Sequence, residues 1–168
     1  EDVCADPDLP REEIAAALVE LVDKSVVRFA GDRYRMLETV RQFGAERLRE
    51  AGAEKVAETG NRHLAHFRVL SREVSREWFG PRQAVLLTRL GEEQANLRAA
   101  MEWSLTQDGQ APRGLRLASA LYPWWIGGGH PGEGRRWLGR LLAATDPLDP
   151  VRTQAMWVEG FVTSVDGD

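Results

Sequence analysis

Residues 21–43 read LVDKSVVRFAGDRYRMLETVRQF, and the rest of the chain is arranged around them. Residues 26–30 are rich in strand-forming side chains, and Gly31 supplies the positive φ that a tight turn needs. Residues 33–36 alternate basic and apolar side chains, which is the period of a half-buried strand. From Leu37 onward the apolar spacing becomes helical. The stretch therefore predicts the end of one helix, a two-stranded hairpin and the start of a second helix.

The helices on either side of this hairpin have recognisable ends. Pro10 and two acidic residues after it are typical of a helix start, and Gly52 is typical of a helix end. A helix, a hairpin and a helix in this order form the C-terminal half of a winged helix. We therefore expect residues 1–52 to be a partial winged-helix domain.

The rest of the chain, residues 53–168, has the apolar spacing of successive helices. The helices are predicted at 54–77, 82–106, 115–126, 131–144 and 151–165. Gly91 favours a break in the second of these, and Pro123 should bend or shorten the third. The last helix follows the pattern of the first half of a pair, so we expect the chain to be a fragment of a longer protein.

The later helices resemble a tetratricopeptide-like hairpin. The residues with the offsets of its packing positions are Leu121, Trp125, Gly134, Leu138 and Leu141. The small Gly134 suits a close crossing of paired helices, and the turn at Gly129-His130 is predicted to recur at Gly167-Asp168. Such hairpins stack into a solenoid with a concave surface. The predicted fold is thus mainly α, a partial winged helix with a small β-hairpin followed by a tetratricopeptide-like superhelix.

The chain has six tryptophans, and packing between helices is the preferred interpretation of all of them. The alternative is that the adjacent pair Trp124 and Trp125 stacks on a ligand. In that alternative, Arg135 and Arg136 of the next helix are further candidates for contacts in the repeat groove.

Charge and cysteine content narrow the functional classes. The net charge of −4 argues against a globally basic nucleic-acid binder. Cys4 is the single cysteine and cannot form an internal disulfide, and no long apolar run is present. These features favour a reducing cytoplasm and no membrane segment.

Charge is nevertheless uneven along the chain. Residues 1–23 hold eight acids against Arg11 alone, whereas residues 24–49 hold seven bases against three acids. The candidates for contacts with DNA or with another domain are Arg28, Arg33, Arg35 and Arg41. An ordinary solvated face is the favoured alternative, because the preceding helix is acidic.

No catalytic or metal-binding constellation is evident. His63 and His66 could share a helix face, but no third ligand follows at a metal-like spacing. Residues 127–129 (GGG) lack the preceding strand and the Lys-Ser/Thr of a phosphate-binding loop. No set of nucleophile, base and orienting group is recognisable, so we expect no enzyme, no bound cofactor and no metal in this chain.

Four segments together resemble one protein family. They are LVDKSV at 21–26, YRMLETVRQF at 34–43, EQANLRAA at 93–100 and GRRWL at 134–138. The resemblance is to the large bacterial signal-transduction ATPases with numerous domains, including LuxR-type and antibiotic-regulatory-protein-type transcriptional regulators. It implies a preceding nucleotide-binding domain, ATP or ADP bound there, and a separate DNA-binding domain at one end of the polypeptide.

The resemblance also implies a position for nucleotide sensing. Many relatives begin the helix after the wing with Met-His-Asp, whose histidine contacts the β-phosphate of ADP. The matching residues here are Met36, Leu37 and Glu38, and a leucine cannot donate a hydrogen bond to phosphate. Glu38 is alternatively a first-turn acid of its own helix.

The implied function is a non-catalytic regulatory and interaction module. The winged helix would act as an intramolecular switch on the nucleotide-binding domain, and the repeats would sense a protein or small-molecule effector. The alternative is a winged-helix fragment that contacts DNA through its basic wing.

Overall fold

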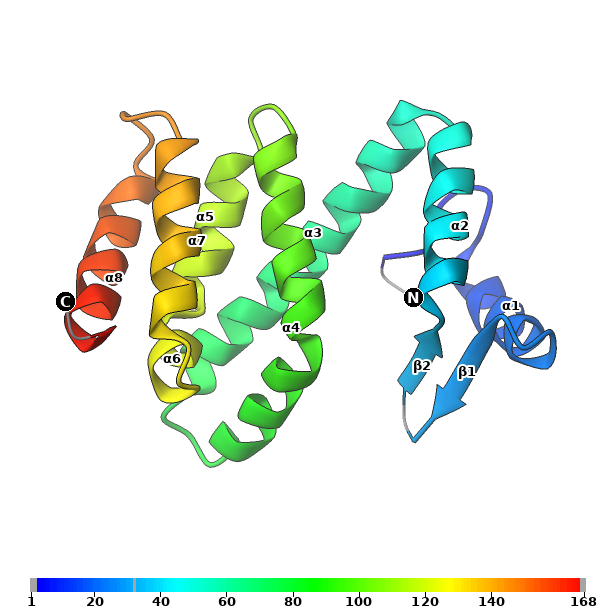
Figure 1. The fold of residues 1–168 in the computed structure, drawn as a ribbon, viewed down its shortest axis with the longest axis horizontal. Coiled ribbons are helices and arrows are strands. Elements are labelled where there is room, and N and C mark those ends of the chain that lie inside the picture. The colour runs from blue at the N-terminus through cyan, green and yellow to red at the C-terminus, as the bar shows by residue number, and fades with distance from the viewer. Residues whose placement is uncertain (1–2, 32, 167–168) are drawn as a thin grey trace. The chain divides into compact units, whose positions relative to one another are not determined.

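Helices make up most of the described chain, and one two-stranded hairpin lies between the first two of them in sequence (Figure 1). The structure is a computed structural model that describes residues 3–31 and 33–166. The predicted mainly α fold, with a small β-hairpin followed by packed helices, is confirmed. Asp32 of the hairpin turn and the predicted turn at Gly167-Asp168 lie outside the described residues.

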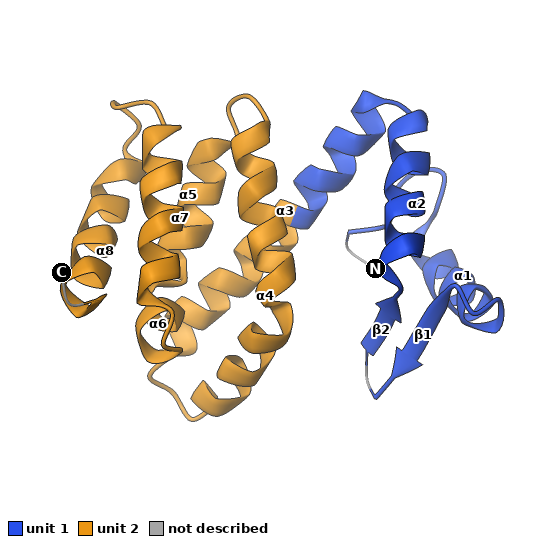
Figure 2. Ribbon diagram, in the orientation of Figure 1, with its two compact units in different colours: residues 1–63 blue, residues 64–168 orange. Residues whose placement is uncertain are grey.

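The chain forms two compact units, residues 1–63 and residues 64–168 (Figure 2). The elements of the first are α1 (Arg11–Asp23), β1 (Val27–Ala30), β2 (Arg33–Met36), α2 (Glu38–Glu50) and the start of α3 (Ala53–Glu77). The second holds the rest of α3, then α4 (Gln83–Thr106), α5 (Ala111–Ala120), α6 (Tyr122–Gly127), α7 (Pro131–Ala143) and α8 (Val151–Asp166). α3 starts at the predicted boundary between residues 52 and 53, but the two compact units divide within this helix, between residues 63 and 64. The predicted domain division stays a prediction.

The hairpin in the first unit forms where the alternation predicts it. β1 and β2 pair antiparallel, with Val27 opposite Met36 and Phe29 opposite Tyr34. Gly31 has a φ of 69°, the positive value that the tight turn requires. Because Val27 is buried while its strand neighbours are exposed, the hairpin is anchored mainly at its base.

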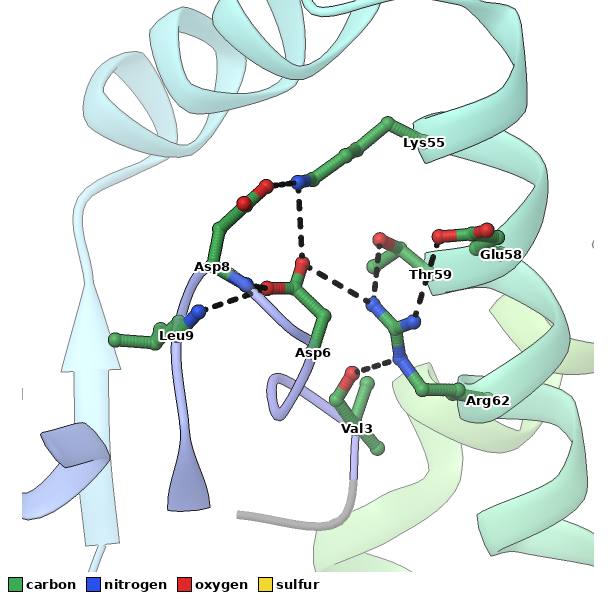
Figure 3. A network of polar contacts seen from close by, with 8 residues as sticks. All are labelled: Val3, Asp6, Asp8, Leu9, Lys55, Glu58, Thr59 and Arg62. Carbon is green, nitrogen blue, oxygen red and sulfur yellow. Dashed lines mark hydrogen bonds and ion pairs between the residues drawn. The ribbon is translucent and has the colours of Figure 1, made fainter. Parts of the chain in front are cut away.

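A polar network in the first unit holds the loop before α1 against the start of α3 (Figure 3). The Asp6 carboxylate accepts hydrogen bonds from the backbone N–H groups of Asp8 and Leu9, each at 2.9 Å. Lys55 forms ion pairs with Asp6 and Asp8, and Arg62 Nε donates to the carbonyl of Val3 at 2.9 Å. The hydrogen bond from Leu9 is the main reason that the pKa of Asp6 is lowered.

The second unit contains the main hydrophobic core. α5 lies at its centre and packs against α4, α7 and α8. The stripe Leu64, Phe67, Leu70 and Val74 of α3 is buried in this core, as its helical spacing indicates. The tetratricopeptide-like assignment of these helices stays a prediction.

Of the two residues predicted to interrupt helices, Pro123 does so and Gly91 does not. Pro123 lies in the first turn of α6, and the chain breaks at Leu121 between α5 and α6, as expected. The expected break at Gly91 is wrong, because α4 continues from Gln83 to Thr106. Leu86, Leu90 and Leu97 are buried around Gly91 and hold both halves to the core. Their packing outweighs the roughly 1 kcal/mol that a helical glycine costs.

The expected close packing at Gly134 is confirmed. A Cβ added there would lie 2.5 Å from Cγ of Trp125, so only glycine lets α7 approach this ring. Trp125 is buried, and its Nε1 donates to the carbonyl of Ala118 at 2.8 Å. Trp157 of α8 is 63% exposed, and its ring lies edge-on to Tyr122 of α6 with the centroids 6.3 Å apart.

Candidate functional site

The hairpin places two of the predicted arginines directly opposite each other. Arg28 of β1 pairs with Arg35 of β2, so both side chains lie on the same face, and both are exposed. Arg33 is the partner of Ala30 and lies on the same face. Like charges in this arrangement repel, and an anion or an acidic surface would relieve that repulsion.

Arg41 is engaged within its own helix. It donates hydrogen bonds to both carboxylate oxygens of Glu38, at 2.9 and 2.7 Å, and Gln42 donates a third at 3.1 Å. The hydrogen bond from Arg41 is the main reason that the pKa of Glu38 is lowered. These contacts support the interpretation of Glu38 as a first-turn acid of α2.

The other two residues of the predicted sensor position flank the strand-to-helix junction. Met36 ends β2, and Leu37 is the N-cap residue of α2, with an extended φ and ψ of −64° and 146°. Leu37 makes no side-chain capping hydrogen bond. Both side chains are exposed and apolar, so neither can donate a hydrogen bond to a phosphate.

The first unit exposes several large apolar side chains close together in sequence. Phe29 and Phe43 are each 56% exposed, and the Phe29 ring lies against Tyr34 with centroids 4.9 Å apart. No residue of α2 is buried, although its apolar positions share one helical stripe. The exposed apolar set consists of Phe29, Tyr34, Met36, Leu37 and Phe43, and we call it the apolar surface of the hairpin. A surface of this kind usually marks a contact with another protein part.

A surface depression of about 270 Å³ lies between α4 and α7 in the second unit. Its lining residues are Arg98, Glu133, Arg136, Trp137 and Arg140. Arg98 binds Glu133 through two hydrogen bonds of 2.7 Å, and Arg140 binds Glu102 through two of 2.9 Å. These two pairs join helices that are far apart in sequence.

One arginine of this depression, Arg136, is available to bind an anion because the other charged residues pair with each other. The hydrogen bond from Arg98 is the main reason that the pKa of Glu133 is lowered, so Glu133 stays ionised and is a poor general base. Arg140 also lies over the Trp137 ring, 4.8 Å from its centroid. Arg136 has no acidic partner among the described residues. The site can therefore hold an anionic group beside the Trp137 ring.

The structure brings together only part of the predicted repeat-groove set. Arg136 lines the depression, whereas Arg135 lies 3.6 Å from Asp166 of α8. Trp124 and Trp125 are buried in the core, which supports packing over ligand stacking for this pair. Trp137, which is half-buried and lines the depression, was not predicted as a site residue from the sequence. The available signal was a pair of complementary charge patterns. Arg98 and Glu102 are four residues apart on α4, and Glu133 and Arg140 are seven apart on α7, on either side of Trp137.

Within 3–31 and 33–166, no cluster of three or more His, Cys, Asp or Glu side chains is placed to hold a metal ion. None of the helices in the same ranges combines the length and the apolar character that crossing a membrane requires.

Comparisons with known proteins give partial matches. The chain is 37% identical over 145 residues to proteins named "Putative HTH-type transcriptional regulator" from Mycobacterium bovis and from Mycobacterium tuberculosis. The match covers 83% of this chain and only 16% of each relative. No family model matches, and no solved structure matches. The chain is therefore similar to a limited part of much longer proteins that carry this name.

Proposed function

We propose that this chain is a non-catalytic regulatory and interaction module of a multidomain, ATP-dependent transcriptional regulator. The hairpin unit would dock on a nucleotide-binding domain of the same polypeptide, and the helical unit would sense an effector or protein partner. ATP or ADP would bind outside this chain, and DNA would be bound by another domain.

The apolar surface of the hairpin is the observation that carries this proposal. Phe29, Leu37 and Phe43 expose more than half of their surface, although their spacing is that of buried positions. Burying apolar area gains about 25 cal/mol for every Å² removed from water. Contact with a domain that covers these side chains would therefore be favourable. The limited match to long relatives supports a covering domain within the same polypeptide.

The helical unit offers two places for an effector. The depression between α4 and α7 presents Arg136 beside the Trp137 ring and would suit an anionic, planar small molecule. α8 presents Trp157 and Phe161, whose stacked rings have centroids 5.6 Å apart, and this face would suit a further helix. Such an effector acts by binding one state of the switch more tightly. A hundredfold bias requires about 2.7 kcal/mol of differential binding.

Hydrogen exchange on the full-length polypeptide tests the docking. With ADP bound, we expect the amides of β1, β2 and the first turns of α2 to exchange slowly. With ATP bound they should exchange faster, because the hairpin unit would leave the nucleotide-binding domain. The amides of α5 serve as an internal reference, since their protection comes from the core of the second unit.

A pair of matched variants sharpens this test. Phe43→Ser should remove the ADP-dependent protection, whereas Phe79→Ser, which changes an 87% exposed ring in the second unit, should keep it. Both residues are exposed, so neither variant should unfold the protein. Equal exchange of the hairpin amides in the two nucleotide states would refute the switch.

The alternative function is DNA binding through the hairpin. The exposed pair Arg28 and Arg35 favours it, whereas Arg41 is already bound to Glu38. A gel shift of duplex DNA that weakens steeply with salt and disappears in Arg28→Gln/Arg35→Gln would support this alternative. The absence of any shift at low salt would exclude it.

A further inference from the structure

Five arginines that the proposed function does not use lie on α3 and α5 of the second unit. The three on α3 are four residues apart, so they share one face of that helix. We call the set the arginine row, and its members are Arg68, Arg72, Arg76, Arg113 and Arg116. Arg72, Arg76 and Arg116 line one surface depression of about 210 Å³, together with Ser75 and Gln154. α3 and α5 therefore present their guanidinium groups to a common surface.

The arginine row differs from the other arginines near it by lacking acidic partners. Arg82 and Arg89 form ion pairs with Glu73 and Glu77, at 2.7 to 3.1 Å. Among the described residues, no member of the row has a carboxylate within ion-pair distance, and Arg113 bonds only the side-chain amide of Gln110. The carboxylates closest to the row in sequence are thus already neutralised by other cations.

The environment of Arg68 shows how crowded these charges are. Its Nε is buried and has no hydrogen-bond partner among the described residues. Burial, followed by the positive charges of Arg72, Arg116 and Arg113, lowers the pKa of Arg68. On a chain with a net charge of −4, such a concentration of unpaired cations favours an anionic partner.

The dimensions and composition of the row distinguish between kinds of anion. Arg68 to Arg76 spans eight residues of helix, or about 12 Å at 1.5 Å per residue, which exceeds the reach of a single small anion. A second depression of about 360 Å³ beside the row is lined by Val69, Arg72, Glu73, Arg76 and Glu77. Its two carboxylates are the ones paired with Arg82 and Arg89. Only Val69 and Ala120 are apolar among the residues that line the two depressions. The residues that line these depressions offer no apolar pocket in which an acidic peptide could bury anchoring side chains. They also include no aromatic ring on which the bases of a single strand could stack. Duplex phosphates need only cations.

We propose that the arginine row binds the phosphate backbone of double-stranded nucleic acid without reading its base sequence. Guanidinium groups suit this role because each can donate two parallel hydrogen bonds to one phosphate. The row lies in the second unit, so this contact is separate from the hairpin contact of the alternative function. It also goes beyond the proposed docking role, in which another domain binds DNA.

Fluorescence anisotropy with a labelled duplex of arbitrary sequence tests the proposal over a range of salt concentrations. Three to five phosphate contacts predict a slope of log K against log salt of about −2.7 to −4.5, since each contact contributes about −0.9. Arg72→Gln/Arg116→Gln should weaken binding and make the slope shallower by about 1.8. Arg72→Lys/Arg116→Lys keeps the charges and should restore most of the slope.

The matched control is Arg28→Gln/Arg35→Gln, which changes the net charge equally but acts on the hairpin. It should leave the slope unchanged, and thermal unfolding of all variants verifies that they stay folded. The proposal is overturned if the wild-type chain binds no duplex at low salt, or if the two glutamine variants weaken binding equally. Loss of binding in the hairpin variant alone also overturns it and supports the alternative function instead. Stronger competition by a single strand or by polyglutamate would assign the row to a different partner.

Discussion

Individual residues show how tightly the second unit is packed. Gly134 lets α7 approach the ring of Trp125, and Gly114 lets α5 approach Ser104, whose Oγ would lie 1.9 Å from an added Cβ. Neither glycine has a positive φ, so their small size is what the structure requires. At such positions one methyl group must displace buried neighbours.

We expect Gly134→Ala to lower the free energy of unfolding by about 1–3 kcal/mol, the usual cost of overpacking a core. Gly160→Ala on α8 is the matched control, because an added Cβ there meets no atom within 4 Å. It should raise stability by roughly 0.5–1 kcal/mol, since alanine is the better helix former. Urea unfolding of both variants measures the difference. Equal effects at the two positions would contradict the packing argument.

At the scale of elements, the hairpin is the least supported part of the first unit. Only Val27 of its two strands is buried, and Arg28 faces Arg35 across the ladder. Two adjacent strands are marginally stable in water by themselves. On the stripe of α2, Phe43 is 56% exposed and Val40 and Leu48 are half-buried, so the described residues leave apolar surface of this helix uncovered as well.

Replacing the repulsive pair by an attractive one should stabilise the hairpin. We expect Arg35→Glu to slow amide exchange in β1 and β2, with a gain of about 0.2–1 kcal/mol. The double variant Arg28→Glu/Arg35→Glu restores two like charges and should lose that gain. Exchange rates that do not differ between the single and double variants at low salt would show that the two side chains do not interact.

At the scale of the whole molecule, the two units have very different cores. Every member of the main buried cluster lies between residues 64 and 162. Among the described residues of the first unit, only Ile14 and Val27 are buried apolar side chains. The first unit therefore has much less buried apolar area to stabilise it.

We expect the two units to open with different free energies in the isolated chain. Amides of α5 and α7 should exchange about a hundredfold more slowly than those of α1 and the hairpin, a difference of about 2.7 kcal/mol in opening free energy. Hydrogen exchange followed by mass spectrometry measures both units in one sample. A single protection level across the chain would mean that the first unit is stabilised by contacts that its exposed residues do not reveal.

Local order in this chain is readable from its residues. The helix from Glu38 to Glu50, the turn at Gly31 and the interruption near Pro123 follow from signals within a few positions of each other. Periodicity and the conformational limits of glycine and proline act over that same short range, so these features are predictable without coordinates.

The tertiary packing of the helices decides which side chains are buried and which distant charges pair. The stripe of α2 has the spacing of a core helix, yet none of its residues is buried, while α4 passes unbroken through Gly91. The pairs Arg98–Glu133 and Arg140–Glu102, and the meeting of α3 and α5 arginines, join residues more than thirty positions apart. No local sequence pattern specifies such contacts, because they form only when the helices pack together. The neighbours of each side chain are then set by the free energy of the whole fold.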